Sequence, residues 1–354
     1  MSQSTTQITE HQDIYSSLAD EYGAITSGVA ITNRSSINHL SFRGSDSLDL
    51  LNRLSTNDLV SLQKYRATQT VLTSNKGRII DILTVLRLPD SLLVMLSPES
   101  DQKVTQWIDF YTFSEDVSIE NISNKTAMFS VVGPKAPQLV AQITKLPISS
   151  MDQYSAIPTT ISSIPVILLR SDFVGLPAYD FVVNSSKSDS LWQILVSYDI
   201  SPAGAKSIDL VRIEQCIPTF NKEITEDYNP LEAGFARFIS FTKGCYVGQE
   251  VVTRLNTYEK VQRSLVSLHW KTKDSVNTGS KLQLDDQTVG IITSTAWSPS
   301  EEKYIGLGYV KKKYAAEGTI LTANTNSKPT TCLLYTSDAA DDTPCVDLGG
   351  RRII

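Results

Sequence analysis

The chain has 354 residues, a formal net charge of -6 at pH 7 and 41% apolar residues. This length predicts two or three structural units with enough apolar side chains to form cores. The acidic balance argues against a general nucleic-acid binder, which would carry a basic face. No stretch approaches the roughly 20 apolar residues of a membrane span, and the polar first dozen residues lack the features of a signal peptide. We therefore expect a cytoplasmic protein with no direct contact to nucleic acid or membrane.

The four cysteines are widely spaced and form no CxxC pair. A disulfide framework or a structural zinc site is therefore not expected. The three histidines are also far apart in the sequence and show no metal-ligand spacing. We predict no metal site.

The N-terminal part predicts helices alternating with strands. A polar tail precedes a short helix in DIYSSLADEY. HLSFRG predicts a strand that ends at Gly44, followed by a helix whose apolar stripe is Leu48, Leu51 and Leu54. TQTVLTSNKGRIIDILTVLRLPDSLLVML predicts three strands, because SNKG and LPDS are typical turn sequences. Pro98 then opens another helix at the tolerated first position.

A similar alternation returns further along the chain. TAMFSVVG, IPVILLR and YDFVVNS predict strands, whereas PKAPQLVAQI, SDSLWQILVSY and AKSIDLVRIEQC predict helices. Helices packed on mostly hairpin-linked strands favour an α+β fold over a doubly wound parallel sheet. After about residue 263, short strand candidates separated by turn residues predict a small barrel-like β unit.

These patterns divide the chain into four segments. Residues 1–25 form a tail and short helix, 26–263 an α+β region of two subdomains with a boundary near residue 125, and 264–331 a C-terminal β-barrel. Residues 332–354 carry two of the four cysteines, show no usable periodicity and resemble a translated sequencing adapter. We expect this last segment to be non-native or disordered, which would leave the barrel without its last strand.

One stretch, KGCYVGQEVVTRL, places Cys245 between glycines, with Lys243 two residues before it and an expected helix after it. A thiol near a helix N-terminus and a cation has a lowered pKa and reacts more readily. The glycines permit tight turns or a close approach of the backbone to a ligand. The residues alone leave two interpretations open, a reactive thiol and a small apolar side chain buried in a loop.

KGCYVGQE resembles the signature of the YgfZ-type folate-binding proteins, relatives of the glycine cleavage T-protein. FRGSDSLDLLNRLSTNDL, TSNKGRIIDILTV, RIEQCIPTFNKEI and NPLEAGF resemble further motifs of that superfamily and occur in the expected order. The resemblance covers about residues 25–330. It implies two intertwined ferredoxin-like α+β domains and a small C-terminal β-barrel around a central folate pocket.

The resemblance also implies tetrahydrofolate as the ligand and assigns residues to it. Asp81 stands where T-proteins carry a carboxylate that orients folate and its one-carbon unit. The candidate catalytic residues are Cys245, Lys243 and Asp81. The candidate folate-binding residues are Asp81, Tyr179, Arg212, Glu214, Tyr246, Gln249, Glu250 and Arg254.

Other roles remain open for several of these residues. Taken alone, Asp81 fits a strand carboxylate that faces solvent or pairs with Arg78. Arg212 and Glu214 point to different faces of a helix, so at most one is expected to reach a shared ligand directly. Arg254 also fits a solvated position on its helix.

The chain departs from the T-protein pattern at two places. Ile82 follows Asp81 where T-proteins have a second aspartate. In VGLPAYD, Leu176 and Ala178 replace a glutamate and a glycine. These losses, together with the Cys245 motif, favour the YgfZ-type branch.

Three functions follow as hypotheses. The first, which the resemblance implies, is a tetrahydrofolate-binding accessory protein for the assembly or repair of iron–sulfur enzymes, including tRNA-modifying ones, with the thiol of Cys245 at the folate pocket. Because clusters usually need four protein ligands, an iron–sulfur enzyme or a cluster-assembly protein would have to share any cluster contact. The alternative is a folate-dependent aminomethyltransferase or demethylase, in which Asp81 orients the reacting nitrogen. The third is a non-catalytic scaffold that docks partners.

Overall fold

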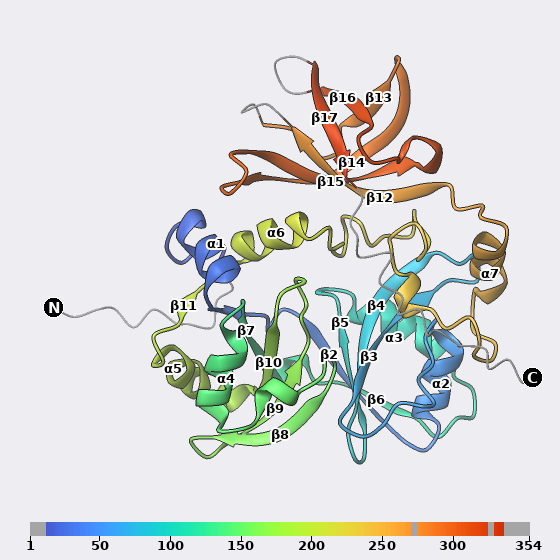
Figure 1. Ribbon diagram of the computed structural model, residues 1–354. Helices are drawn as coiled ribbons and strands as arrows, with labels where there is room; N and C mark the ends of the chain where they lie inside the picture. Colours follow the sequence, from blue (N-terminus) through green and yellow to red (C-terminus); the bar gives the residue numbers. More distant parts are fainter. Residues whose placement is uncertain (1–11, 271–274, 325–328, 336–354) are drawn as a thin grey trace, which may run out of the picture.

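The computed structural model describes residues 12–270, 275–324 and 329–335 (Figure 1). Two β-sheets with their helices lie beside each other, and a closed β-barrel lies over both. The expected combination of intertwined α+β domains with a C-terminal barrel is confirmed.

The first sheet has five antiparallel strands in the order β3-β4-β5-β2-β6. The SNKG and LPDS turns join β3 to β4 and β4 to β5, as their sequences predict. Two helices bury their apolar stripes against one face of this sheet, forming a core with Leu51, Leu83 and Val104. The elements are β2 (Asn38–Arg43), α2 (Ser47–Leu54), β3 (Ala67–Thr73), β4 (Ile79–Arg87), β5 (Leu92–Leu96), α3 (Asp101–Phe110) and β6 (Ser118–Asn121).

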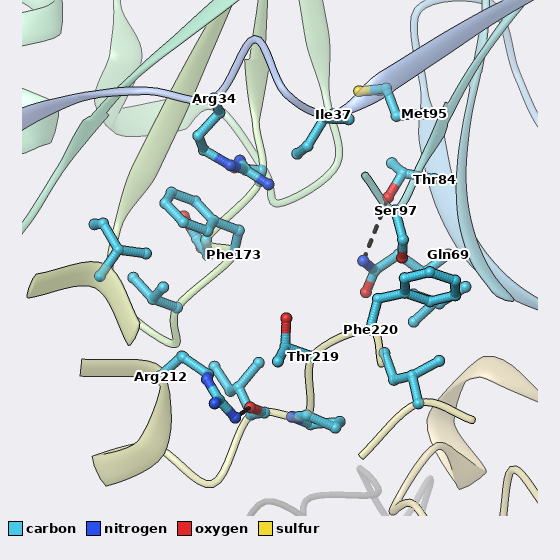
Figure 2. A pocket seen from close by; sticks show the side chains of 18 of the residues that line it. Arg34, Ile37, Gln69, Thr84, Met95, Ser97, Phe173, Arg212, Thr219 and Phe220 are labelled. Carbon is cyan, nitrogen blue, oxygen red and sulfur yellow. Dashed lines mark hydrogen bonds between the residues drawn. The ribbon is translucent and has the colours of Figure 1, made fainter. Parts of the chain in front are cut away.

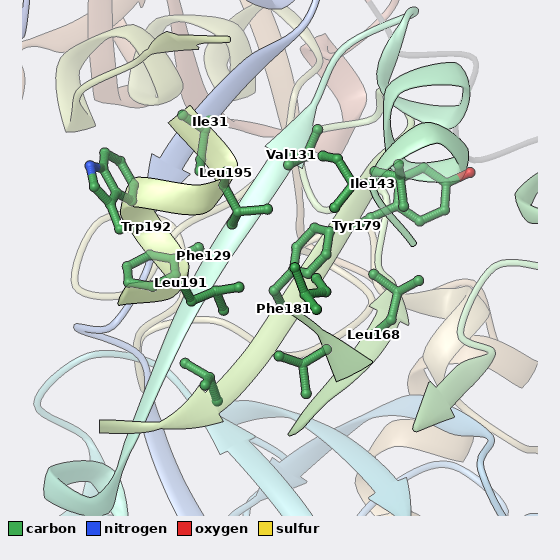
Figure 3. Close-up of a cluster of buried hydrophobic side chains, with 14 of the residues drawn as sticks. Ile31, Phe129, Val131, Ile143, Leu168, Tyr179, Phe181, Leu191, Trp192 and Leu195 are labelled. Atoms are coloured by element: carbon green, nitrogen blue, oxygen red, sulfur yellow. The ribbon is translucent and has the colours of Figure 1, made fainter. Parts of the chain in front are cut away.

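The second sheet has six strands in the order β11-β1-β7-β10-β9-β8. Strand β1 belongs to this sheet although the next strand along the chain belongs to the first, so the two units are intertwined. Two helices cover a core that contains Phe129, Phe181 and Trp192 (Figure 3). The elements are β1 (Ala30–Asn33), β7 (Thr126–Val132), α4 (Ala136–Thr144), β8 (Ala156–Ile161), β9 (Ile164–Arg170), β10 (Ala178–Asn184), α5 (Ser188–Val196) and β11 (Ser201–Pro202).

Two helices, α1 (Leu18–Ser27) and α6 (Ala205–Glu214), lie side by side between the second sheet and the barrel (Figure 1). Helix α1 begins later than DIYSSLADEY predicts, because Ser17 acts as its N-cap and accepts a hydrogen bond from the Asp20 amide. Residues 1–11, part of the expected tail, lie outside the described residues. The remaining helices are α7 (Gln249–Thr257) and the 3-10 turns η1 (Ser123–Lys125), η2 (Ile148–Ser150), η3 (Ser185–Lys187), η4 (Ala236–Phe238) and η5 (Lys312–Tyr314).

The barrel closes in the order β12-β15-β14-β13-β16-β17. Its last strand reaches Tyr335, beyond the boundary expected at residue 331. Cys332 is buried in the barrel core and its strand pairs with both β12 and β16, so these residues complete the barrel. The rest of the expected non-native tail, residues 336–354, lies outside the described residues. The strands are β12 (Arg263–Trp270), β13 (Lys281–Leu284), β14 (Gln287–Ser298), β15 (Lys303–Lys311), β16 (Ile320–Asn324) and β17 (Pro329–Tyr335).

Candidate functional site

A cavity of about 760 Å³ lies where the three units meet. Side chains of both sheets, of α6, of the segment 215–238 and of Leu265 on β12 line it. Figure 2 shows 18 of the lining side chains around an open centre. The volume is within the range of about 300–1,000 Å³ that is typical of small-molecule sites.

The wall formed by the first sheet is uncharged. Ile82 and Thr84 on β4 and Gln69 on β3 line the cavity. Thr84 and Gln69 are labelled in Figure 2. The Gln69 side-chain nitrogen donates to the Thr84 hydroxyl at 3.3 Å, and its oxygen accepts from the Tyr154 hydroxyl at 2.8 Å. Burial raises the pKa of Tyr154 to about 12, so at neutral pH this hydroxyl keeps its proton. This wall offers apolar contact and neutral hydrogen bonds.

The opposite wall carries a buried ion pair. Arg34, which follows β1, donates from Nη1 to Oδ1 of Asp180 on β10 at 3.0 Å. The same oxygen accepts from the Ser130 hydroxyl at 2.5 Å. The Arg34 guanidinium lies 3.6 Å from the centroid of the Phe173 ring, a cation–π contact. A carboxylate, a guanidinium and an aromatic ring therefore face the cavity together.

Arg212 lines the cavity, but its guanidinium is occupied by protein groups. It donates from Nε to Asp209 at 2.7 Å, from Nη1 to Glu223 at 2.9 Å and from Nη2 to the Ser294 hydroxyl at 2.6 Å. Because Ser294 belongs to β14, this network ties α6 to the barrel. Arg212 therefore fixes one side of the cavity instead of offering a free cation to a ligand.

Glu214 does not line the cavity, in agreement with its position on another face of the helix. Its carboxylate accepts hydrogen bonds from the Ser298 hydroxyl at 2.6 Å and the Tyr22 hydroxyl at 3.1 Å. It thus connects α6 to α1 and to the end of β14.

The structure places Asp81 outside the cavity, which corrects the expectation that it faces folate. Its side chain lies on the other face of β4 from Ile82, and it is fully buried. The Asp81 carboxylate accepts four hydrogen bonds, from the amides of Ile82 and Ser97 and from the hydroxyls of Ser97 and Ser100. Burial raises the pKa of Asp81. Its observed contacts organise the turn that leads into α3.

Tyr179, which was expected to bind folate, also lies on the face of its strand that points away from the cavity. It is 1% exposed and lies in the apolar core of the second sheet (Figure 3). Successive side chains of a strand point to opposite faces, so its neighbour Asp180 reaches the cavity instead. Applying this period of two to YDFVVNS would have identified Asp180.

Lys243 holds backbone instead of tuning a thiol at the cavity. Its ammonium donates to the carbonyl oxygens of Asn52 at 2.6 Å, Ser55 at 2.9 Å and Asn57 at 2.5 Å. These carbonyls lie at and just beyond the end of α2, where helices leave acceptors unsatisfied. Burial lowers the pKa of Lys243 to about 8. Cys245 is exposed and, like Lys243, does not line the cavity.

Gly248 packs the same loop onto the SNKG turn. Its φ is +86°, and a Cβ atom at this position would lie 2.5 Å from the carbonyl oxygen of Ser74. The glycine is therefore required for a close approach between two segments of the protein. This contact gives the glycine a structural reason that involves no ligand.

The other expected contacts near the cysteine also lie away from the cavity. Tyr246 is 7% exposed, and burial raises its pKa to about 12. Glu250 and Arg254 form an exposed ion pair at 3.9 Å on α7, the helix that Gln249 begins. Of the folate-binding residues expected from the sequence, only Arg212 lines the cavity.

The sequence reasoning missed most of the polar cavity residues. Arg237, on η4, lines the cavity, is exposed and forms no ion pair with any residue in the described ranges. Arg34 lies in an ordinary turn sequence, TNRSS, and no local signal marks it. The other missed side chains are Gln69, Tyr154, Phe173 and Asp180.

Comparisons with known proteins agree with this architecture. Residues 3–243 match the GCVT N-terminal domain, and residues 263–336 match the glycine cleavage T-protein C-terminal barrel domain. An aminomethyltransferase of Thermoanaerobacter pseudethanolicus is 25% identical over 330 residues, covering 92% of this chain and 89% of the relative. An aminomethyltransferase of Thermotoga maritima is 27% identical over 303 residues, covering 84% of this chain and 82% of the relative.

A solved structure has the same fold. The glycine cleavage system aminomethyltransferase T from Bartonella henselae matches with a TM-score of 0.82 and 17% identity, covering 91% of this chain and 89% of that structure. None of the helices in the described ranges is long and apolar enough to span a membrane. The first of the two domain matches alone spans more than half of the chain. The chain therefore belongs to the glycine cleavage T-protein family.

Proposed function

We propose that this protein binds tetrahydrofolate in the central cavity and takes part in folate-dependent one-carbon transfer. The observation that carries the proposal is the cavity itself, which lies between both halves of a T-protein-like fold and has chemically distinct walls. The names of the relatives favour aminomethyl transfer. When bound, tetrahydrofolate supplies nitrogen atoms that accept a one-carbon unit.

The lining residues fit the three parts of a folate. The Arg34–Asp180 pair suits the polar edge of the pterin ring, which carries both hydrogen-bond donors and acceptors. Ile82, Phe173 and other apolar side chains suit the flat faces of the rings. Arg237 suits the anionic glutamate end, because it is exposed and forms no ion pair with a described residue.

The first test is an anaerobic calorimetric titration of the purified chain with tetrahydrofolate. We expect saturable binding to one site, and then tetrahydrofolate-dependent release of ammonia from an aminomethyl donor. An Arg237→Gln variant should bind more weakly without losing stability. A folded protein that does not bind tetrahydrofolate would contradict the proposal.

A second candidate function is the YgfZ-type accessory role toward iron–sulfur enzymes. Two observations favour it. The thiol of Cys245 is exposed and accessible to a partner protein. Ile82 faces the cavity at the position after Asp81, so this wall carries no carboxylate. In this role the cavity would bind folate, while the thiol would act at the surface.

The accessory role is tested by rescue of bacteria that lack their own YgfZ-type protein. Iron–sulfur-dependent tRNA methylthiolation would be measured with the wild-type chain and with Cys245→Ala, each ending at Tyr335 so that β17 stays intact. Rescue by the wild type alone would support the role and the thiol. Tetrahydrofolate binding and ammonia release without any rescue would leave one-carbon transfer as the function.

A further inference from the structure

We propose that the end of α3 is a docking site for a basic amphipathic helix of a partner protein. Four aromatic side chains form the site, and we call them the aromatic patch: Trp107, Phe110, Tyr111 and Phe113. The patch lies on the side of the first sheet that carries α2 and α3, away from the central cavity. The inference therefore does not depend on the binding of folate.

The patch contains the two most exposed large apolar side chains of the described residues. Phe113 is 86% exposed, and Phe110 is 69% exposed. The centroid of the Phe110 ring lies 5.0 Å from that of Tyr111 and 6.4 Å from that of Trp107. Single exposed apolar side chains are common on protein surfaces, whereas a contiguous group of them marks an interaction site.

The loop that carries Phe113 is held in place by hydrogen bonds. One oxygen of the Glu115 carboxylate accepts from the amides of Phe113 at 2.7 Å and Ser114 at 3.1 Å. The other oxygen accepts from Nη2 of Arg53 on α2 at 2.8 Å. The Phe113 amide and the Arg53 guanidinium lower the pKa of Glu115 to about 2, so this carboxylate is ionised at neutral pH. Phe113 is therefore presented by a fixed loop, which reduces the entropy that docking would cost.

Arg53 also connects the patch to the segment that carries the exposed cysteine. Its carbonyl oxygen accepts from the Val247 amide at 3.0 Å, while its guanidinium holds Glu115. Val247 follows the exposed Cys245 by two positions. The patch therefore adjoins the segment that presents this thiol.

The charges around the patch are acidic. Residues 109–120 contain no lysine or arginine and four acidic residues, Asp109, Glu115, Asp116 and Glu120. Two of the four are paired with cations, whereas Asp109 and Asp116 are exposed and form no ion pair with a described residue. This acidic rim repels the phosphates of nucleic acids and of anionic membranes, and it attracts lysine and arginine side chains.

Aromatic anchors inside an acidic rim define the chemistry of the occupant. A second copy of the chain, docked symmetrically, would bring two acidic rims together. An amphipathic helix with lysine or arginine beside its apolar stripe offers apolar contact to the rings and positive charge to the rim. The occupant is therefore such a helix, with Phe110 and Phe113 as its anchors.

The test titrates the full chain with two labelled synthetic helices, one of leucine and lysine and one of leucine and glutamate, and follows fluorescence anisotropy. We expect the leucine–lysine helix to bind about 10-fold or more tightly than its counterpart. Phe110→Ser combined with Phe113→Ser should weaken this binding by about 10-fold or more, because aromatic anchors carry most of the energy of an interface. Ile320→Ser, at a barrel residue that is 60% exposed, is the matched control and should bind like the wild type.

Asp109→Asn combined with Asp116→Asn tests the acidic rim. This variant should bind the leucine–lysine helix about threefold more weakly at low salt and like the wild type at high salt. All variants should keep the melting temperature and the tetrahydrofolate affinity of the wild type, because the changed side chains are exposed and outside the cavity. If the double phenylalanine variant does not fold, Phe113→Ser alone, at the most exposed position, takes its place.

Equal binding of the leucine–lysine helix to the wild type and to the folded phenylalanine variant would overturn the inference, because the helix would then bind elsewhere. Tighter binding of the leucine–glutamate helix would contradict the role of the acidic rim. Wild-type dimers in sedimentation velocity that the phenylalanine variant loses would assign the patch to a second copy of the chain instead.

Discussion

In the central cavity, charged side chains from distant parts of the chain meet around an open space, whereas in the cysteine loop (residues 243–248) residues that are close in sequence pack against the backbone of two other segments. Arg34 and Asp180 are 146 positions apart in sequence. In the cysteine loop, the Lys243 ammonium donates hydrogen bonds to backbone carbonyls at the end of α2. Gly248 packs against the SNKG turn. A compact sequence motif can therefore mark close packing between distant segments, while the residues best placed for a ligand carry no local signal.

The largest effect on stability is expected from Lys243→Met. Three backbone carbonyls would lose their donor in a partly buried site, at a cost of about 3 kcal/mol in the free energy of unfolding. Urea denaturation measures this cost. Lys76→Met, in the exposed SNKG turn, is the matched control. Equal stability of the two variants would mean that the lysine of the cysteine loop is not structural.

Asp81→Asn is expected to destabilise the protein by about 2 kcal/mol, because the amide has one acceptor oxygen where the carboxylate accepts four hydrogen bonds. Tetrahydrofolate affinity should change by less than about twofold once folding is accounted for. Asp90→Asn, in an exposed turn, controls for the loss of charge. A large loss of tetrahydrofolate affinity in a variant of normal stability would show that Asp81 belongs to the binding site.

The destabilisation by Asp81→Asn should depend on pH. Burial raises the pKa of Asp81 above its ordinary value of 3.8, so the folded state retains this proton at pH values where the unfolded state has lost it. The contribution of Asp81 to stability is then fully present below the unfolded pKa, and it declines as pH rises through the folded pKa. Urea denaturation across acidic pH should show the difference between wild type and variant shrinking as pH rises. A growing difference would contradict the raised pKa.

A smaller loss of stability, about 1 to 2 kcal/mol, is expected from Gly248→Ala because of its positive φ and the short distance to Ser74. Gly244→Ala in the same loop is the control, since its added Cβ would meet no heavy atom within 4 Å. The melting temperatures of the two variants show whether the loss comes from the close contact of Gly248 with Ser74 or from any substitution in this loop. Identical melting temperatures would refute the close approach.

The smallest effect is expected at Cys245 itself. Saturating tetrahydrofolate should change its alkylation rate by less than about twofold, because the residue is exposed and outside the cavity. Cys216 lines the cavity, so its alkylation should slow in the same sample. Mass spectrometry of the alkylated peptides measures both thiols at once. Strong protection of Cys245 would place it at the ligand.

The sequence patterns predicted the helices and strands better than they predicted the residues that line the cavity. The SNKG turn and the apolar stripe of α2 depend on local chemistry, so they could be identified directly. The adapter-like composition after residue 331 concealed that Cys332 and Leu334 close the barrel, which depends on pairing with distant strands. The alternation of side chains along a strand could have identified Asp180. Arg34 reaches the cavity only through tertiary packing, which no local pattern reveals.

The central claim is that ligand binding belongs to the cavity and not to the cysteine loop. Anaerobic calorimetric titration with tetrahydrofolate of the wild type, Asp180→Asn and Cys245→Ala tests it most directly. We expect Asp180→Asn to weaken binding by about 10-fold or more, because a buried ionic acceptor is lost, and Cys245→Ala to bind like the wild type. Loss of binding in folded Cys245→Ala, with Asp180→Asn unaffected, would contradict the account.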